Sequence, residues 1–129
     1  RMPDNDGARP LDEPLRADGD AAYFSTLPVR AMVHAVRAAG LPCSVSYTAG
    51  TYVCNAVLYN ALYLAATRFP GLRAGFVHVP YLDSQAANLK AGTPSMSLAR
   101  ITEGLTAMVA AMVEHEGEDI VSASAGCEH

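Results

Sequence analysis

The sequence has little positive charge, and it lacks any apolar run of membrane-spanning length. Lys90 is the only lysine, and 9 Lys and Arg residues stand against 13 Asp and Glu residues, which gives a net charge of −4. Without a basic stripe, binding to nucleic-acid phosphates has little support. The richest apolar stretch, residues 108–113, is far too short to cross a bilayer, and no signal-peptide-like apolar region opens the chain. We therefore expect neither a nucleic acid nor a membrane as a partner.

Cysteine is scarce, and its spacing is equally informative. The three cysteines, Cys43, Cys54 and Cys127, are an odd number and do not suggest a disulfide framework. No C-x-x-C or H-x-x-x-H spacing occurs, so we expect no metal site and no cofactor. A reducing cytoplasm is the default compartment for such a chain. Half of the 129 residues are hydrophobic and 17% are charged, which is enough apolar material for one folded domain.

The order of predicted elements is typical of an α/β protein. Apolar residues recur at helical spacing in three stretches, and two short apolar runs read as buried strands. The expected elements are a loop over 1–20, a helix from Pro28 to about 39 capped by Ser25 or Thr26, a strand over 42–47, a helix over 52–69, a strand over 73–79, a loop over 81–94, a helix from a Ser95 cap to about 113, and a frayed tail over 117–129. This alternation predicts parallel strands covered by helices.

The number of strands is small for a sheet of this kind. A stable open sheet usually has more than two strands, and the chain begins abruptly in polar, turn-rich sequence. We therefore expect residues 1–129 to be part of a larger domain whose N-terminal strands lie outside this sequence.

The most informative stretch is residues 46–55, SYTAGTYVCN. A turn of small residues follows an apolar run and leads directly into a helical pattern, so Cys54 stands where the helix begins. Unpaired N–H groups and the positive end of the helix dipole favour a thiolate at such a position. Cys54 is therefore a candidate nucleophile, although a cysteine at a helix start is more often a small buried hydrophobe.

His78 is the candidate base for this thiol. It lies near the end of the second predicted strand, and parallel neighbouring strands would bring it to the same sheet edge as Cys54. The imidazole would take the thiol proton and later protonate a leaving amine, while N–H groups near Val53 and Cys54 would hold an oxyanion. The alternative is a core histidine without a catalytic role, because the order of elements does not orient side chains.

Five ordered motifs resemble those of the pyroglutamyl peptidase I family, the pyrrolidone-carboxylate peptidases of cysteine peptidase family C15. Residues 46–55 resemble the family's nucleophile motif, and 75–81 (GFVHVPY) resemble its histidine motif. The other three motifs are 1–5 (RMPDN), 22–28 (AYFSTLP) and 94–98 (PSMSL). The resemblance runs from Arg1 to about Ile120.

The resemblance implies a three-layer α/β/α sandwich with a mostly parallel mixed sheet, and a cytoplasmic cysteine omega-peptidase. Such enzymes remove an N-terminal pyroglutamyl residue from peptides through a thiol acyl-enzyme, without a cofactor, and the resemblance suggests a homotetramer. Cys54 would be the nucleophile, and His78 the general base and acid. Arg1 would act near the thiol or the oxyanion. The walls of the apolar substrate pocket would come from Met2, Tyr52 and Val53.

The chain departs from the family pattern at its beginning. The family's catalytic glutamate, the aromatic residues that cover the pyrrolidone ring, and the first strands all precede the segment matched by Arg1. We therefore interpret the chain as the C-terminal part of such a domain. Two alternatives stay open: a catalytically incomplete fragment or scaffold of the same fold, and a different cysteine amidase.

Overall fold

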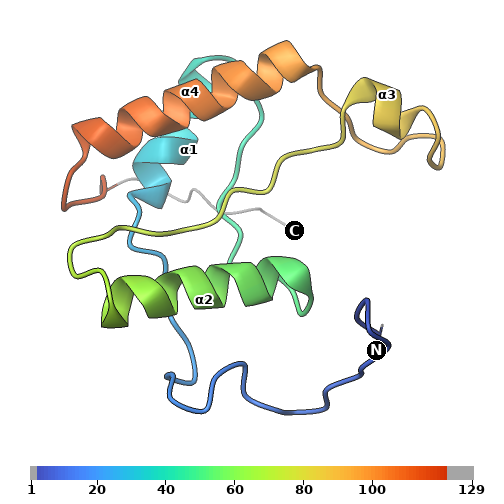
Figure 1. Cartoon of the computed structure of the whole chain (residues 1–129). Helices are drawn as coiled ribbons and strands as arrows, with labels where there is room; N and C mark the ends of the chain where they lie inside the picture. The colour runs from blue at the N-terminus through green and yellow to red at the C-terminus, as the bar shows by residue number, and fades with distance from the viewer. Residues whose placement is uncertain (1–2, 122–129) are drawn as a thin grey trace.

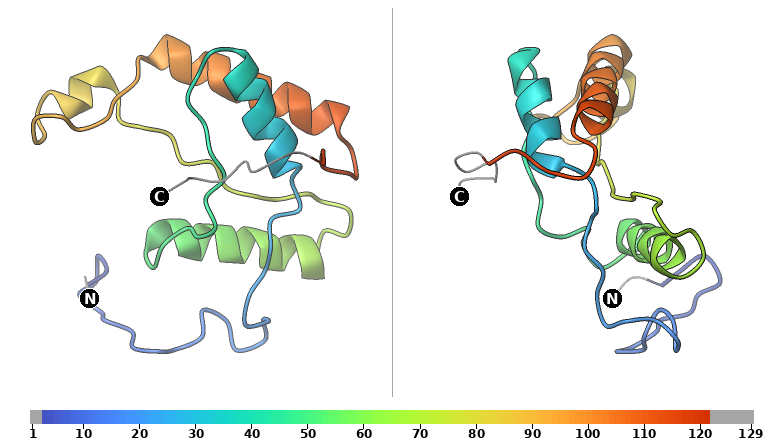
Figure 2. Two further views of the ribbon diagram at one scale, coloured as in Figure 1. Left: turned by 180° about the vertical axis from the view of Figure 1, so that it is seen from behind. Right: turned by 90° about the vertical axis from the view of Figure 1, so that its left-hand side faces the viewer.

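Four helices and long extended connections make up the chain in a computed structural model that describes residues 3–121. The helices are α1 (Val29–Ala38), α2 (Val53–Thr67), α3 (Asp83–Ala86) and α4 (Leu98–Glu114). α1 and α4 lie together on one side, α2 lies on the other, and extended segments run between them (Figures 1 and 2). None of the helices described in this range is long and apolar enough to cross a membrane.

The two predicted strands are present as extended chain, but not as a sheet. Within residues 3–121 the prediction of strands over 42–47 and 73–79 is wrong in this respect, since neither segment forms a strand. Parallel strands exist only through backbone hydrogen bonds to neighbours, and the two segments share no such ladder. Both segments nevertheless cross the space between α2 and the α1–α4 pair, where the sheet was expected (Figure 1).

The core lies between α1 and α4. Ala31 and Met32 of α1 pack with Ala111 of α4, and all three are buried. Val77 of the 73–79 segment is partly buried against the same cluster. Gly104 of α4 is buried beside Leu41, and a Cβ at this position would lie at an ordinary contact distance of 3.4 Å from the Leu41 side chain. The 73–79 segment is therefore fixed to the helix pair through Val77.

The start of α1 is capped from the far end of the chain. Pro28 occupies the N-cap position and provides no side-chain cap. Instead, the Asp119 carboxylate accepts hydrogen bonds from the backbone N–H groups of Arg30 at 3.0 Å and Ala31 at 2.9 Å. Ile120 also packs against the core cluster, so this part of the expected frayed tail is anchored. Residues 122–129, including Cys127, lie outside the described residues.

Two predicted caps are wrong, because the hydroxyl groups concerned bond elsewhere. Ser25 and Thr26 do not cap α1; both bond to the backbone of Ala74. Ser95 bonds to Asp83 at 2.7 Å, whereas Ser97 caps α4 by accepting from the Arg100 N–H. In both places the hydroxyl groups bond to residues far from them in the sequence and not to the N–H groups of the nearest helix.

The N-terminal loop is irregular, as expected, but it is anchored on α2. Tyr63 donates a hydrogen bond to Asp18 at 2.6 Å, and the Arg16 guanidinium lies 4.0 Å from the centre of the Tyr63 ring. Tyr23 packs edge-on against Tyr59 with ring centres 5.2 Å apart. The phenol of Tyr63 and, less strongly, Arg16 hold the pKa of Asp18 below its usual value. These contacts fix the loop along the side of α2 that faces away from α1 and α4 (Figure 2).

Candidate active site

Cys54 is the second residue of α2, directly after a turn built from small residues. Gly50 adopts a φ of 79°, which favours glycine, and its N–H donates to the Thr48 hydroxyl at 3.0 Å. The N-cap residue, Tyr52, provides no side-chain cap, so its side chain accepts none of the first N–H groups of α2. The prediction of a cysteine at a helix start is confirmed, and the sulfur lies where donors and the helix dipole favour negative charge.

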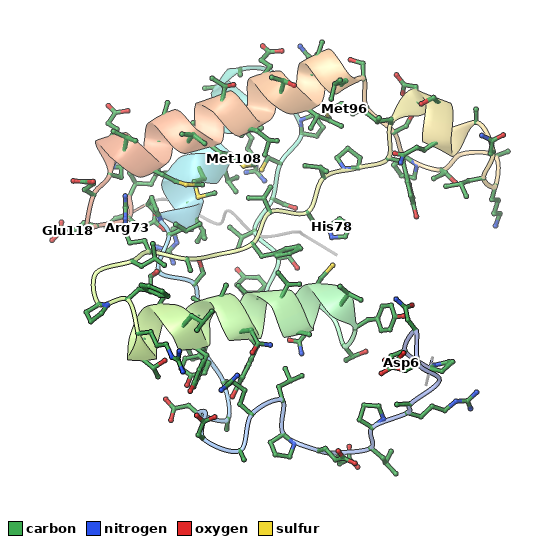
Figure 3. All side chains as sticks on the ribbon, in the orientation of Figure 1. Asp6, Arg73, His78, Met96, Met108 and Glu118 are labelled. Carbon is green, nitrogen blue, oxygen red and sulfur yellow. The ribbon has the colours of Figure 1, made fainter. Side chains whose placement is uncertain are left out.

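His78 faces this thiol from the 73–79 segment. The distance from Cys54 Sγ to His78 Nδ1 is 3.9 Å, within the range of a sulfur hydrogen bond. Figure 3 shows the imidazole projecting from the extended segment on the side of the beginning of α2. The expectation that the two residues meet is therefore confirmed. A neutral His78 with its hydrogen on Nε2 would accept the thiol proton at Nδ1.

Phe76 lies beside His78, although it was not among the site residues predicted from the sequence. The two ring centres lie 6.3 Å apart, with a tilt of 46° between the planes. In extended chain, residues two apart share a face, so Phe76 and His78 project together while Val77 points toward the core. The expectation that 73–79 is extended chain was the signal in the sequence that could have predicted the contact between Phe76 and His78.

The remaining site predictions have different outcomes. Tyr52 and Val53 directly precede Cys54, and their exposed fractions are 50% and 56%. Arg1 and Met2 lie outside the described residues. Among residues 3–121 no hydrogen bond joins a carboxylate to His78, and no cluster of His, Cys, Asp and Glu is suited to a metal ion.

A second thiol lies nearby but in a different environment. Cys43 is partly buried, and burial raises the pKa of this thiol, although the positive charge of Arg37 partly offsets the effect. Cys43 and His78 both border a cavity of about 400 Å³ whose other walls are mostly apolar residues of α4 and of the segments 41–44 and 77–80. Cys54 does not line this cavity, although its partner His78 does.

A thiol at a helix start that faces an imidazole across 3.9 Å is the arrangement that cysteine hydrolases use to make a nucleophile. The family model described as pyroglutamyl peptidase matches residues 1–115, and the chain belongs to this family.

Curated relatives agree with this assignment. A pyrrolidone-carboxylate peptidase of Lactobacillus johnsonii is 49% identical over 129 residues, which are 100% of this chain and 60% of the relative. A protein of the same name from Streptococcus suis is 48% identical with the same coverage, 100% of this chain and 60% of the relative. The chain thus spans about 60% of the length of these relatives.

Solved structures lead to the same family. The crystal structure of pyroglutamyl peptidase I from Bacillus amyloliquefaciens has a TM-score of 0.85 and 37% identity, over 95% of this chain and 57% of that chain. The pyrrolidone carboxyl peptidase from Thermococcus litoralis has a TM-score of 0.84 and 38% identity, over 95% of this chain and 59% of that chain. The likeness supports the α/β class expected from the sequence.

Proposed function

We propose that this chain carries the nucleophile and the general base of a cysteine omega-peptidase that removes N-terminal pyroglutamyl residues from peptides. The observation that carries the proposal is the Cys54–His78 contact of 3.9 Å at the start of α2. Membership of the pyroglutamyl peptidase family supports the choice of substrate.

Acylation begins with proton transfer from the Cys54 thiol to Nδ1 of His78. The thiolate attacks the carbonyl carbon of the pyroglutamyl residue, a C–S bond forms, and the carbonyl electrons move to the oxygen. The N–H groups at the beginning of α2, around Val53 and Cys54, are suited to bind this oxyanion. The intermediate then collapses, the amide C–N bond breaks, and the imidazolium gives its proton to the departing amine.

Deacylation reverses the roles with water as the nucleophile. His78 takes a proton from water, the hydroxide attacks the thioester, and the C–S bond breaks with return of a proton to the sulfur. The products are free pyroglutamate and the shortened peptide. Tyr52 and Val53 are exposed beside the sulfur, which supports a role in contacting the lactam ring. Arg1 and Met2 are proposed to contribute to the same region on the basis of the family motif alone.

We further propose that residues 1–129 form the C-terminal part of one three-layer α/β/α domain that works as a cytoplasmic homo-oligomer, a tetramer by family resemblance. The extended segments between α2 and the α1–α4 pair support the layered arrangement. An exposed apolar stripe on α4 supports an oligomer; its residues are Leu98, Leu105, Val109 and Val113. Free thiols at Cys43 and Cys54 support a reducing compartment.

The direct test is hydrolysis of a pyroglutamyl anilide. The protein should release the free amine, and Cys54→Ala should lower kcat/KM by at least about 10³-fold, as loss of a nucleophile does in other hydrolases. Cys43→Ala is the matched control and should keep most of the activity. Full activity of Cys54→Ala would refute the mechanism, and hydrolysis of acetyl or glutamyl anilides in preference to pyroglutamyl anilide would favour a different cysteine amidase.

One observation favours a second candidate, a catalytically incomplete scaffold. Within the described residues, no carboxylate orients His78. Removing the group that orients a catalytic histidine costs about 10⁴-fold in a serine-protease triad. The isolated 129-residue chain should therefore be nearly inactive if it is a scaffold, and hydrolysis of the anilide at an ordinary enzymatic rate would refute this candidate.

A further inference from the structure

Residues 25–27 form a clamp on the beginning of the segment that carries His78. The backbone N–H of Thr26 donates to the carbonyl oxygen of Ala74 at 3.0 Å, and the Ala74 N–H donates to the Thr26 hydroxyl at 2.8 Å. The hydroxyl groups of Ser25 and Thr26 each donate to the same carbonyl oxygen at 3.3 Å. Both polar groups of Ala74 are thus held by two consecutive residues that lie 48 or more positions earlier in the chain.

The clamp depends on a close approach at the next residue. At Gly75, an added Cβ would lie 2.5 Å from the Leu27 side chain and 2.6 Å from the Ser25 hydroxyl oxygen. Only glycine leaves room for residues 25–27 to lie this close to the extended segment. The position of the backbone at Ala74 and Gly75 is therefore fixed by van der Waals contact with residues 25–27 as well as by hydrogen bonds.

The clamp also sets which way His78 points. Once residue 74 is fixed, the alternation of an extended chain sends Phe76 and His78 to the α2 side and Val77 to the α1–α4 core. A rotation or slip of the segment would move the imidazole away from Cys54 and lengthen the 3.9 Å contact between the two side chains. The 22–28 motif would otherwise have no role in the proposed reaction.

We propose that Thr26 is a positioning residue for the reaction: through its hydrogen bonds to Ala74 it holds the 73–79 segment so that the imidazole of His78 faces the Cys54 thiol. Thr26 does not touch the reacting atoms and acts only through this segment. The proposal rests on the proposed function for its link to catalysis, and on the clamp geometry alone for its link to the reactivity of Cys54.

The test compares Thr26→Val with Thr26→Ser, which respectively remove and keep the hydroxyl at similar size. The readout is alkylation of Cys54 by iodoacetamide, followed by mass spectrometry of the peptide that contains this residue. Near pH 6 the reaction depends on the imidazole, whereas near pH 9.5 a thiol ionises without help, since its ordinary pKa is about 8.5. Thr26→Val should lower the ratio of the pH 6 rate to the pH 9.5 rate by about tenfold or more, because a misplacement of a reacting group by about 1 Å can slow a reaction by this much. Thr26→Ser should retain the wild-type ratio.

A purely structural role would give a different pattern. Thr26→Val would then lower the melting temperature and leave the ratio unchanged, and that result would overturn the proposal. Thr102→Val is the matched control, because the Thr102 hydroxyl also donates to a carbonyl, that of Leu98 at 2.9 Å, but at an exposed position of α4. If Thr26→Val yields no folded protein, Ser25→Ala is the milder variant: it removes the 3.3 Å bond to Ala74 and the 3.3 Å bond that the Ser25 hydroxyl accepts from the Leu27 N–H. A smaller fall of the ratio in Ser25→Ala supports the proposal, and an unchanged ratio overturns it.

Failure of the proposed function is distinguishable from failure of the clamp. If the wild-type protein does not hydrolyse pyroglutamyl anilide but the alkylation ratio still falls in Thr26→Val, the substrate is wrong and the clamp stands. If the anilide is hydrolysed and the ratio is unaffected, the function stands and the clamp does not. In the active protein the same variant should lower kcat with little change in KM, because the clamp does not touch the substrate.

Discussion

His78 presents its Nδ1 atom, rather than Nε2, to the sulfur of Cys54 at 3.9 Å. The ring is exposed, so a small molecule can take its place. We expect His78→Ala to lower hydrolysis of pyroglutamyl anilide by at least about 10³-fold, because the thiol loses its base and the leaving amine loses its acid. Added imidazole should restore part of the rate in a concentration-dependent way, measured as amine release under first-order conditions.

The control for this rescue is the nucleophile itself. Cys54→Ala should show no response to imidazole, since no thiol is available to be activated. A His78→Ala protein that keeps wild-type activity without imidazole would show that the imidazole has no part in the reaction.

The pair of catalytic candidates could be predicted from the sequence for local reasons. The turn of small residues before Cys54 and the position of His78 near the end of an apolar run are both patterns of a few residues, and both are as expected in the structure. The helices α2 and α4 were predictable in the same way, because their apolar spacing is local.

The features that the sequence did not predict depend on residues far apart in the chain. Asp119 caps α1 from 88 residues away, and Thr26 bonds to Ala74 from 48 residues away. A hydroxyl or carboxylate gives the same local signal whether it caps the nearest helix or bonds across the fold. The prediction of two strands failed for a related reason, since an apolar run specifies an extended segment but not the neighbour with which it pairs.

Asp119→Ala should destabilise the fold by about 1 kcal/mol, the typical cost of losing a helix cap. The carboxylate accepts from two N–H groups at the start of α1, and Pro28 offers no substitute. The measurement is the free energy of unfolding in urea. Glu118→Ala removes the neighbouring carboxylate, which makes no such contact with α1, and should leave the free energy nearly unchanged. Equal losses in both variants would mean that charge, not capping, is responsible.

Lysine should restore only part of the stability that Arg73 contributes to the fold. Its guanidinium donates to the carbonyl oxygens of Met112 at 2.8 Å and His115 at 3.3 Å, at the C-terminal end of α4. Arg73→Met should cost about 1 kcal/mol in urea unfolding, because two hydrogen bonds and a favourable charge at the helix end are lost. Arg73→Lys should lose less, since it keeps the charge but not the planar fork. If Arg73→Lys is as unstable as Arg73→Met, the charge contributes nothing.

The loop anchored on α2 should respond to acid through Asp18. The Tyr63 hydroxyl and Arg16 lower the pKa of this carboxyl in the folded protein below its ordinary value of 3.8. The ionised form thus adds stability above pH 3.8, and this contribution is lost as the pH falls through the folded-state pKa. Asp18→Asn should therefore lower the urea midpoint at pH 7, and the difference from wild type should narrow in acid. Asp6→Asn, in the same loop but away from Tyr63, should show no such convergence.

Gly75 and Gly104 provide a matched pair of glycine substitutions with opposite expected results. A Cβ at Gly75 would lie 2.5 Å from the Leu27 side chain, so either the clamp or the segment must shift. At Gly104 the nearest atom, on Leu41, is 3.4 Å away, and the residue lies inside α4. Gly75→Ala should lower both the melting temperature and the activity toward pyroglutamyl anilide. Gly104→Ala should be neutral to stabilising, because alanine is favoured over glycine in a helix by about 1 kcal/mol.

A double variant tests whether the clash is the cause. Combining Gly75→Ala with Leu27→Ala removes the closest contact, so recovery of activity in the double variant, despite the loss of a partly buried side chain, would identify the clash with Leu27 as the cause. A double variant that is no more active than Gly75→Ala would instead locate the cause at the Ser25 hydroxyl, the second atom in the path of the new Cβ.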